Sequence, residues 1–369
     1  EHPQALRLDG VAGLAAQARP DGPQLQDLRP RLNSEPAPVL RILMSAPSLA
    51  QLGSAVAEVM GAHPFELLAL NEAVASQRTD ADVAFISREV TGTSTKHEIH
   101  PALQQVYDLL RQSPGLKWVH IHSAGADRQI YQDLMTQGVQ ISTSSGANAQ
   151  VVATVALAGL LALARKFPML WAEQQARQWI PLMGPRMPRD LPGQTATIVG
   201  WGPIGQKLGS LLQALGLNVV AVRQKIDPSA QLPEGVEQVS FEGLPSALPR
   251  TDWLILACPL TTKTRQLVNA RVLAALPAGA HLINVARGEV VDQDALVLAL
   301  QSGHLGGAFL DVFAHEPLPF DSPLWSMPQV MVTPHAAGHS DGNEARVSQM
   351  FLANLRCWRQ GQALRNTVG

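Results

Sequence analysis

The side chains best suited to acid–base chemistry are an arginine, a glutamate and a histidine in the second half of the chain. They are Arg287 in "NVARGEVVD", Glu316 in "HEPLP" and His335 in "TPHAAG". An arginine can hold a carboxylate through two parallel hydrogen bonds, and a histidine can give a proton to an oxygen or take it back. A glutamate bonded to the other ring nitrogen fixes the tautomer and favours imidazolium. Together the three could bind and protonate a 2-oxo acid, or deprotonate a 2-hydroxy acid.

Each residue also has an ordinary interpretation, as a loop histidine, a solvated glutamate or a surface arginine. Their positions favour a site, because all three follow short apolar segments typical of strands, and ligands of open α/β sheets bind beyond the carboxyl ends of the strands. Cys258, Pro259 and Asp311 reach the same edge. These strands are predicted at 253–257, 281–285, 307–312 and 330–333. One crevice could therefore collect all of these side chains.

A glycine-rich turn, "GWGPIG", lies earlier in the chain between an apolar strand and a helical pattern. Dinucleotide-binding turns require that context. Gly200 permits the tight turn, Gly202 lets the backbone approach a pyrophosphate, and Gly205 allows close packing of the helix on the strand. Pro203 suits the first helical position, and the start of the helix attracts an anion. We therefore expect a dinucleotide site rather than a plain glycine turn.

The strand after the glycine turn ends in Arg223, Gln224 and Lys225, with no acid before Asp227. An acid at this point usually holds the ribose 2′-hydroxyl of NAD, whereas an arginine accepts the 2′-phosphate of NADP. The alternative is a pair of solvated cations at a strand end. The missing acid and the two cations favour NADP(H) as the cofactor, with NAD(H) as the second possibility.

The elements that must position these residues alternate between strands and helices from Val39 onward, which is the pattern of parallel α/β sheets. The first series of strands is predicted at 39–45, 65–70, 83–87, 118–123 and 139–143. A long helix at 148–166 then leads to a second series at 195–199, 218–222, 236–240 and the four segments named above. Two doubly wound sheets are expected. An amphipathic segment at 342–361 could pack back on the first domain.

Length and composition fit an enzyme that binds a small ligand. The chain has 369 residues, enough for two domains, and a formal net charge of −2 with no basic run, which disfavours nucleic acid and membrane surfaces as partners. Its two cysteines are far apart and fit a cytoplasmic protein without a disulfide framework. The apolar run 151–164 is too short to span a bilayer, and the proline-rich residues 1–38 are expected to form a loosely ordered extension.

Other residues could belong to a site but have simpler interpretations. His120 and His122 alternate on a strand, and His97 and His100 would share one turn of a helix. No carboxylate or cysteine lies at ligand spacing from them, so pocket or core histidines are favoured over a metal site. A further group follows the long helix and could line a pocket, fill the core or lie on the surface: Trp171, Trp179, Met183 and Arg186.

Seven segments in order resemble the D-isomer-specific 2-hydroxyacid dehydrogenase family, over about residues 39–368. They are "HSAGAD" (122–127), "SSGANAQVVATVALAGLLALAR" (144–165), "GWGPIG" (200–205), "CPLTTKTRQLVN" (258–269), "NVARGEVVDQDAL" (284–296), "DVFAHEPLP" (311–319) and "TPHAAG" (333–338). The resemblance implies a Rossmann dinucleotide-binding domain, 148–337, inserted in a flavodoxin-like substrate domain, 39–147 plus 338–369. It also implies a homodimer with helix 148–166 at the interface.

The resemblance further implies a role for individual residues. Arg287, Glu316 and His335 fall on the catalytic positions, and Ala124 and Gly125 fall where backbone N–H groups bind the substrate carboxylate. Asp311 falls where the nicotinamide amide is held. The residues expected to bind the cofactor are Gly200, Gly202, Pro203, Ile204, Gly205, Arg223, Gln224, Lys225, Cys258, Pro259, Thr264, Val285, Ala286, Asp311, His335 and Gly338.

Arg223 stands where NAD-using members of the family typically have an acid. In this respect the chain resembles the NADPH-dependent reductases of glyoxylate and hydroxypyruvate. We therefore expect reduction of small 2-oxo acids to D-2-hydroxy acids. Two alternatives remain open. One is a nucleotide-sensing corepressor of the same fold, against which the presence of all three catalytic residues counts. The other is an NAD-preferring dehydrogenase of another D-2-hydroxy acid.

Overall fold

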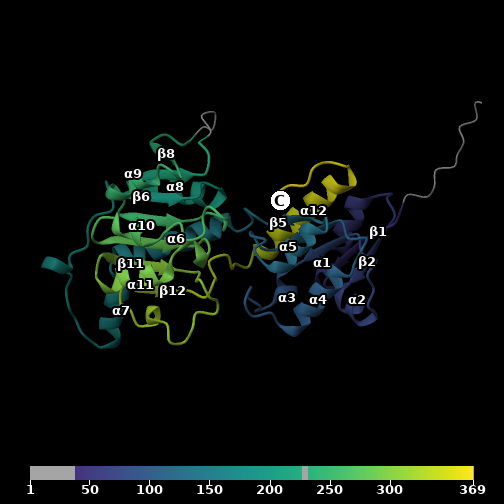
Figure 1. The fold of residues 1–369 in the computed structure, drawn as a ribbon, viewed down its shortest axis with the longest axis horizontal. Coiled ribbons are helices and arrows are strands. Elements are labelled where there is room, and N and C mark those ends of the chain that lie inside the picture. The colour runs from purple at the N-terminus through teal and green to yellow at the C-terminus, as the bar shows by residue number, and fades with distance from the viewer. Residues whose placement is uncertain (1–37, 227–231, 369) are drawn as a thin grey trace, which may run out of the picture. The chain divides into compact units, whose positions relative to one another are not determined.

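The computed structural model describes residues 38–226 and 232–368, and the predicted N-terminal extension lies almost entirely outside them. The described chain forms two α/β sheets (Figure 1). The first sheet has the strand order β13-β5-β4-β3-β1-β2, and the second has the order β12-β11-β10-β9-β6-β7-β8. Every pair of neighbouring strands is parallel except β13 with β5. The predicted fold class, two doubly wound sheets, is confirmed.

The first sheet is built from the beginning and the very end of the described chain. Its strands are β1 (Leu40–Met44), β2 (Phe65–Ala69), β3 (Val83–Ile86), β4 (Trp118–Ile121), β5 (Gln140–Thr143) and β13 (Thr367–Val368). Its helices are α1 (Ala46–Met60), α2 (Leu70–Ser76), α3 (Arg88–Thr91), α4 (Pro101–Arg111), α5 (Gln129–Thr136) and α12 (Asn343–Arg359). One apolar core lies under α2, α4 and α5, and a second lies under α1 and α12. The amphipathic segment predicted at 342–361 therefore packs on the first sheet.

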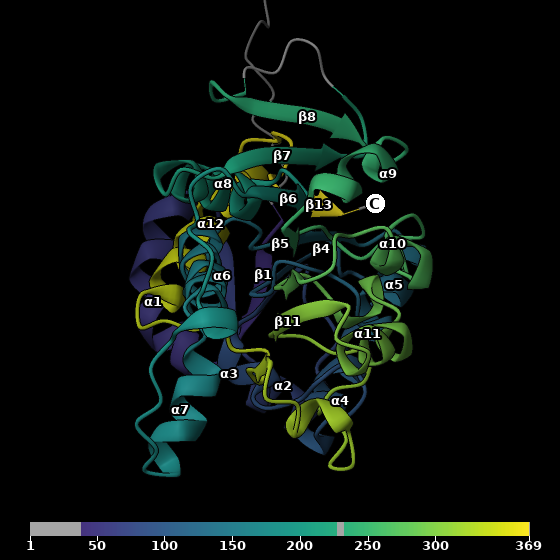
Figure 2. The ribbon, with the colours of Figure 1, turned by 90° about the vertical axis from the view of Figure 1, so that its left-hand side faces the viewer.

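The second sheet follows the long helix α6 (Ala149–Ala164) and the short α7 (Phe167–Gln175). Its strands are β6 (Thr195–Val199), β7 (Asn218–Arg223), β8 (Val236–Ser240), β9 (Trp253–Leu256), β10 (Ala280–Asn284), β11 (Leu305–Leu310) and β12 (Val330–Val332). Its helices are α8 (Pro203–Ala214), α9 (Leu244–Ala247), α10 (Ala270–Ala274) and α11 (Gln293–Gln301). Side chains of α6 and α8 cover one face of the sheet, and those of α9, α10 and α11 cover the other. Figure 2 shows β7 and β8 at one edge of this sheet.

The central strands are buried on both faces, which explains why they read as continuous apolar runs rather than as alternating patterns. All four residues of β3, of β4 and of β9 are buried, and so are all five of β6. Burial of this kind leaves little choice of register, so the strand ends predicted from sequence differ from the observed ends by at most two residues. The carboxyl ends of these strands consequently carry the polar residues expected there.

The part of the chain that the structure describes holds no single helix long and apolar enough to cross a membrane. The pair α6 and α7 passes a test of length and composition only when taken together, and it is bent by 67°.

Candidate active site

The glycine turn has a distinct geometric reason for each of its three glycines. Gly200 has a φ of 103°, and a Cβ there would lie 2.6 Å from the amide nitrogen of Cys258. A Cβ on Gly205 would lie 2.1 Å from the carbonyl oxygen of Gly200, so the helix packs directly on the turn. A Cβ on Gly202 would meet nothing within 4 Å. The second glycine thus faces open space at the start of α8, where a pyrophosphate would need room to approach.

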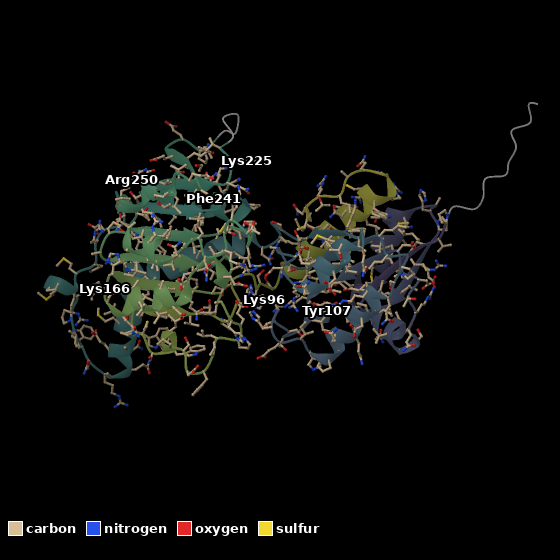
Figure 3. The ribbon with its side chains drawn as sticks, viewed as in Figure 1. Lys96, Tyr107, Lys166, Lys225, Phe241 and Arg250 are labelled. Carbon is tan, nitrogen blue, oxygen red and sulfur yellow. The ribbon has the colours of Figure 1, made fainter. Side chains whose placement is uncertain are left out.

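Helix α8 begins at Pro203, as predicted, and a cavity of about 730 Å³ lies beside it. The guanidinium of Arg223, at the end of β7, reaches this cavity and donates from Nη1 to Oε1 of Gln238 at 3.2 Å. Gln224 and Lys225 follow on the surface, and Figure 3 labels Lys225 at this edge. The cavity is lined by Gly146, Ala149, Trp201, Pro203, Gln206, Lys207, Ser210, Arg223, Leu232 and Pro233. It therefore has two cations, Lys207 and Arg223, and no acid among its lining residues, and it lies next to the glycine turn.

His335 and Glu316 form the predicted pair. Nδ1 of His335 lies 2.8 Å from Oε2 of Glu316, while the other carboxylate oxygen, Oε1, accepts from the backbone N–H of Phe313 at 3.1 Å. Burial alone would raise the pKa of Glu316, but the hydrogen bond and the charge of His335 outweigh it and lower that pKa below its usual range. The His335 side chain is 46% exposed. A fixed, ionised acid thus holds one ring nitrogen, and Nε2 makes no hydrogen bond within the described residues.

The backbone at His335 is left-handed, with a φ of 51°. That conformation is uncommon for a residue with a side chain. Asp311, directly after β11, stabilises it, because its buried Oδ1 accepts from the hydroxyl of Thr333 at 2.6 Å and from the amides of Ala336 and Ala337 at 2.8 and 3.1 Å. The His335 amide in turn donates to the Asp311 carbonyl at 2.8 Å. Asp311 therefore fixes the loop that presents the imidazole.

Arg287 lies against the "HSAGAD" segment of the first sheet. Its Nε and Nη2 donate to the two carboxylate oxygens of Asp127 at 3.1 and 3.2 Å, and its Nη1 donates to the Ala286 carbonyl at 2.8 Å. This bidentate pair leaves one further N–H on each of Nη1 and Nη2 for a substrate. The charge and hydrogen bonds of Arg287 lower the pKa of Asp127 against the opposing effect of burial. A Cβ on Gly125 would lie 2.3 Å from Nη2, so the guanidinium occupies the space that a side chain would need.

Asp127 is a site residue that the sequence reasoning missed. It lies inside the segment 122–127, where the family resemblance implies a role only for the backbone of Ala124 and Gly125. The sequence held a signal for this role. Gly125 and Arg287 are both predicted to bind the substrate, and an acid two residues after Gly125 can pair with that arginine. Among the described residues, the amides of Ala124 and Gly125 donate to no protein acceptor, which leaves them available for the predicted carboxylate.

A second missed feature is the loop between α3 and α4. The hydroxyl of Thr95 donates to the Glu316 carbonyl at 3.0 Å, and the Glu316 amide donates to Nδ1 of His97 at 3.2 Å. Lys96, labelled in Figure 3, forms an ion pair with Glu289 in which both side chains are largely buried. His97 and His100 do not share a helical turn, because the segment before α4 is a loop and His100 caps that helix. The loop holds the backbone of Glu316 from outside its own sheet.

Several predicted residues lie at the strand ends with their polar groups already bonded or buried. Cys258 is buried, which raises the pKa of its thiol to about 12. The hydroxyl of Thr264 is buried and donates to the Pro259 carbonyl at 2.7 Å, closing the turn after β9. Val285 and Ala286 are buried behind Arg287, and Gly338 packs against Asn148 at the start of α6. These residues shape the edge of the sheet rather than present free polar groups.

The remaining candidates separate into core and surface. His120 is fully buried between the hydroxyls of Ser142 and Ser144, at 2.7 and 3.1 Å. Trp171, Trp179 and Met183 are 67%, 95% and 69% exposed, so they lie on the surface rather than in the core. Arg186 pairs with Glu173. In the residues that the structure describes, no three His, Cys, Asp or Glu side chains gather as a metal site would require.

Comparisons with known proteins point to one enzyme family. The family model of the D-isomer specific 2-hydroxyacid dehydrogenase, NAD binding domain, matches residues 157–337. The chain is 31% identical over 267 residues to a glyoxylate reductase of Korarchaeum cryptofilum, an alignment that covers 71% of this chain and 78% of the relative. It is 33% identical over 253 residues to an (S)-sulfolactate dehydrogenase of Chromohalobacter salexigens, covering 68% and 79%.

A solved structure shares the fold over nearly the whole described chain. It is the NADPH-dependent glyoxylate/hydroxypyruvate reductase from Sinorhizobium meliloti in complex with NADP and sulfate, at 26% identity and a TM-score of 0.69, with 89% of this chain and 98% of that chain covered.

Proposed function

The chain belongs to the D-isomer specific 2-hydroxyacid dehydrogenase family, and from that premise we propose that it reduces small 2-oxo acids, glyoxylate and hydroxypyruvate first among them, to D-2-hydroxy acids with NADPH. The observation that carries the proposal is the His335–Glu316 pair at 2.8 Å, on the same sheet as the glycine turn, with Glu316 close enough for its charge to act on Arg287. An acid–base group beside a dinucleotide turn suits reduction of a carbonyl.

The three catalytic side chains divide the chemistry among them. The bound cofactor supplies the hydride. The free N–H groups of Arg287 hold and orient the 2-oxo acid, while the amides of Ala124 and Gly125 bind its carboxylate. The imidazolium of His335 gives its Nε2 proton to the oxygen that becomes the hydroxyl, and takes it back in the reverse direction. The Glu316 carboxylate keeps Nδ1 protonated and stabilises the imidazolium.

The preference for NADPH rests on the end of β7. Arg223 reaches the cavity beside the glycine turn, Lys225 follows on the surface, and Lys207 lines the same cavity. A 2′-phosphate would meet a guanidinium fork and two mobile ammonium groups there, whereas a 2′-hydroxyl would find no carboxylate in the usual place. The relative from Sinorhizobium meliloti, whose structure holds NADP, supports the same choice.

Two further points of organisation belong to the proposal. The domain limits are 39–147 with 338–369 for the substrate domain and 148–337 for the dinucleotide-binding domain. The active form is a homodimer joined through the dinucleotide-binding domain. Its support is the segment after α6, where large apolar side chains are exposed: Phe167, Trp171, Trp179, Ile180, Met183 and Met187. Burying such a patch against a second copy would remove it from water.

The experiment that tests the proposal follows nicotinamide absorbance with purified protein, comparing NADPH with NADH against glyoxylate and hydroxypyruvate. We expect kcat/KM for NADPH to exceed that for NADH by about tenfold or more, since a charge-assisted pair contributes about 1.5–3 kcal/mol. An Arg223→Gln variant should lose that preference through the KM for NADPH. Equal use of both cofactors by the native protein would overturn the cofactor assignment, and no turnover of any 2-oxo acid would overturn the reductase.

A further inference from the structure

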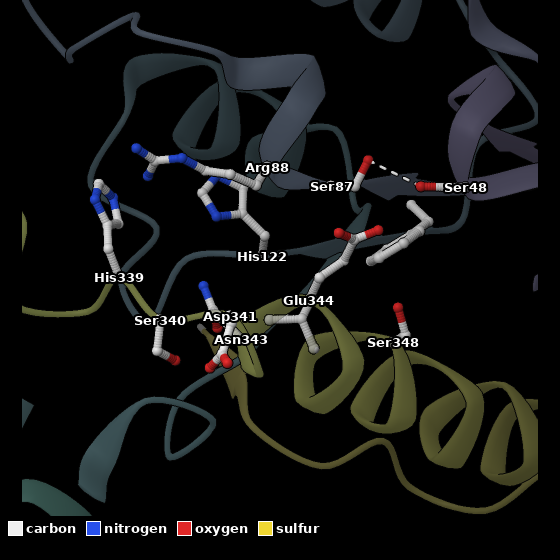
Figure 4. A pocket seen from close by; sticks show the side chains of 12 residues that line it. Ser48, Ser87, Arg88, His122, His339, Ser340, Asp341, Asn343, Glu344 and Ser348 are labelled. Carbon is white, nitrogen blue, oxygen red and sulfur yellow. Dashed lines mark hydrogen bonds between the residues drawn. The ribbon is translucent and has the colours of Figure 1, made fainter. Parts of the chain in front are cut away.

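A second cavity, of about 370 Å³, lies at the carboxyl ends of the strands of the first sheet (Figure 4). It opens between the ends of β3 and β4 on one side and the segment that leads into α12 on the other. Its lining residues are Ser48, Phe85, Ser87, Arg88, His122, His339, Ser340, Asp341, Asn343, Glu344, Val347 and Ser348. A volume of this size lies at the lower end of the range of small-ligand pockets, about 300–1,000 Å³.

The guanidinium of Arg88 lies at one end of this cavity, beside the rings of His122 and His339 (Figure 4). Within residues 38–226 and 232–368, it has neither an ion pair nor a hydrogen bond. The neighbouring acid, Glu89, is turned elsewhere, because its Oε1 accepts from the hydroxyls of Ser48 and Ser87 at 2.8 and 2.7 Å. Arg88 and Glu89 are therefore neighbours in the sequence but do not form an ion pair in the structure.

A second arginine increases the positive charge at this end. Arg128 donates to the carbonyls of Ser94 and Thr95 and to the hydroxyl of Tyr107, all neutral acceptors. Arg88 as a whole residue is exposed, but burial around its guanidinium lowers its pKa, and the repulsion from Arg128 lowers it further. Both arginines also contribute, after burial, to lowering the pKa of His122 to about 4. An anion at this point would relieve the repulsion between these cations.

One of the two acidic residues that line the cavity, Glu344, lies away from that end. In Figure 4 the Glu344 carboxylate points toward Ser87 and Ser48, on the far side of His122 from the Arg88 guanidinium. Asp341 is exposed and accepts from the amide of Gly342 at 2.8 Å. The cavity is thus cationic at the end lined by Arg88 and His339.

Two short segments connect this end with the catalytic residues. His122 begins the segment 122–127, in which Gly125 contacts the Arg287 guanidinium. His339 lies four residues after His335 on the loop that Asp311 holds. Burial and the charge of Arg88 lower the pKa of His339, and the charges of Asp311 and His335 are close enough to act on it as well. A molecule held at Arg287 and His335 could therefore extend along these segments into the cavity.

We propose that the cavity at Arg88, His122 and His339 binds a second acidic group of the substrate, so that the preferred substrates are 2-oxo acids with a distal carboxylate, phosphate or sulfonate. Arg88 is the specificity-determining residue, because its free guanidinium fork matches the oxygens of all three groups. His339 and His122 line the same end. The inference rests on the proposed 2-oxo acid reductase and names its substrate class.

The test compares pairs of 2-oxo acids of equal chain length that differ in the distal charge: oxaloacetate with 2-oxobutyrate, and 2-oxoglutarate with 2-oxopentanoate. The native protein should favour at least one dicarboxylate over its neutral partner by about 10- to 100-fold in kcat/KM, the usual effect of one charge-assisted contact. Arg88→Met should remove this ratio, and Arg88→Lys should retain part of it. Arg111→Met is the matched control and should keep the native ratio, because it removes a surface arginine of α4 that pairs with Asp133 of α5.

A binding measurement guards against a variant that folds poorly. With NADP present, D-malate should raise the melting temperature of the native protein more than D-2-hydroxybutyrate does, and Arg88→Met should abolish the difference. A protein that reduces glyoxylate but shows no preference for a dicarboxylate would overturn this inference and leave the reductase intact. Stabilisation by inorganic phosphate that depends on Arg88, without any substrate preference, would also overturn it, because the site would then hold a free anion.

Discussion

Gly125 is the position where a single methyl group should separate function from folding. In Gly125→Ala the new Cβ would lie 2.3 Å from Nη2 of Arg287 and 2.8 Å from Oδ1 of Asp127. Both are ends of side chains, so the backbone can stay in place while the guanidinium moves. An ordinary contact of about 3.4 Å requires a displacement of about 1 Å. The amide of residue 125, proposed to bind the substrate carboxylate, remains.

The expected loss follows from that displacement. A misplacement of about 1 Å in a group that orients the substrate costs about 100-fold in rate. Folding should suffer by only about 1 kcal/mol, which lowers the melting temperature of a domain this size by about 2–4 °C. The assay is kcat/KM for glyoxylate with NADPH, with the melting temperature measured on the same preparation.

Gly115→Ala is the matched control, because a Cβ there would meet only the carbonyl oxygen of Ala81 at an ordinary 3.8 Å. This variant should keep native activity. A kcat/KM in Gly125→Ala equal to that of the native protein would refute the claim that the reaction depends on the position of the Arg287 guanidinium. A large fall in melting temperature with the loss of activity would show that Gly125 serves the fold instead.

Two further outcomes follow from the charges of the site. Asp127→Asn should keep one hydrogen bond to Arg287 but lose the charge, which should lower kcat/KM for glyoxylate by about 10- to 100-fold. Asp127→Glu should not restore kcat/KM, because the longer side chain would displace the Arg287 guanidinium. Full activity in Asp127→Asn would contradict a positioning role for Asp127. The pKa values of Asp127 and Glu316 are lowered despite burial, so each stabilises the fold above the ordinary carboxyl range of about 4 and loses that contribution as the pH falls through its lowered value. The melting temperature should therefore decrease as the pH is lowered below about 4, and it should decrease less steeply in Glu316→Gln. An equal dependence of melting temperature on pH in both proteins would count against the His335–Glu316 pair.

Much of this fold follows from local sequence, because buried parallel strands are short apolar runs with polar residues at their ends. Strands β6 and β8 begin and end where the sequence predicted. The pair His335 and Glu316 was predictable for the same reason, since both residues follow neighbouring strands of one sheet. The glycine turn was predictable because its three glycines stand at the expected spacing between an apolar strand and a helical pattern, although the atoms that exclude a side chain at Gly200 belong to Ala257 and Cys258 after β9.

The missed features all depend on contacts between distant segments. Asp127 meets Arg287 across 160 residues, and Lys96 meets Glu289 across 193. Strand β13 has two residues, too few to show any periodicity, and it is defined only by its antiparallel pairing with β5. The direction in which Glu89 turns, away from Arg88, is set by Ser48 in the first turn of α1 and Ser87 after β3, and it has no sequence signal of its own.

The carboxylate of Asp311 joins the loop of His335 to the end of β11, on the sheet that also carries the glycine turn. The proposed proton donor, His335, and the predicted dinucleotide turn therefore belong to one part of the molecule, the second sheet. Gly125 and Asp127 belong to the other sheet and touch that part through Arg287. In the proposed reaction, a movement of one sheet against the other would change how tightly the substrate is held, while His335 would keep its position relative to the glycine turn.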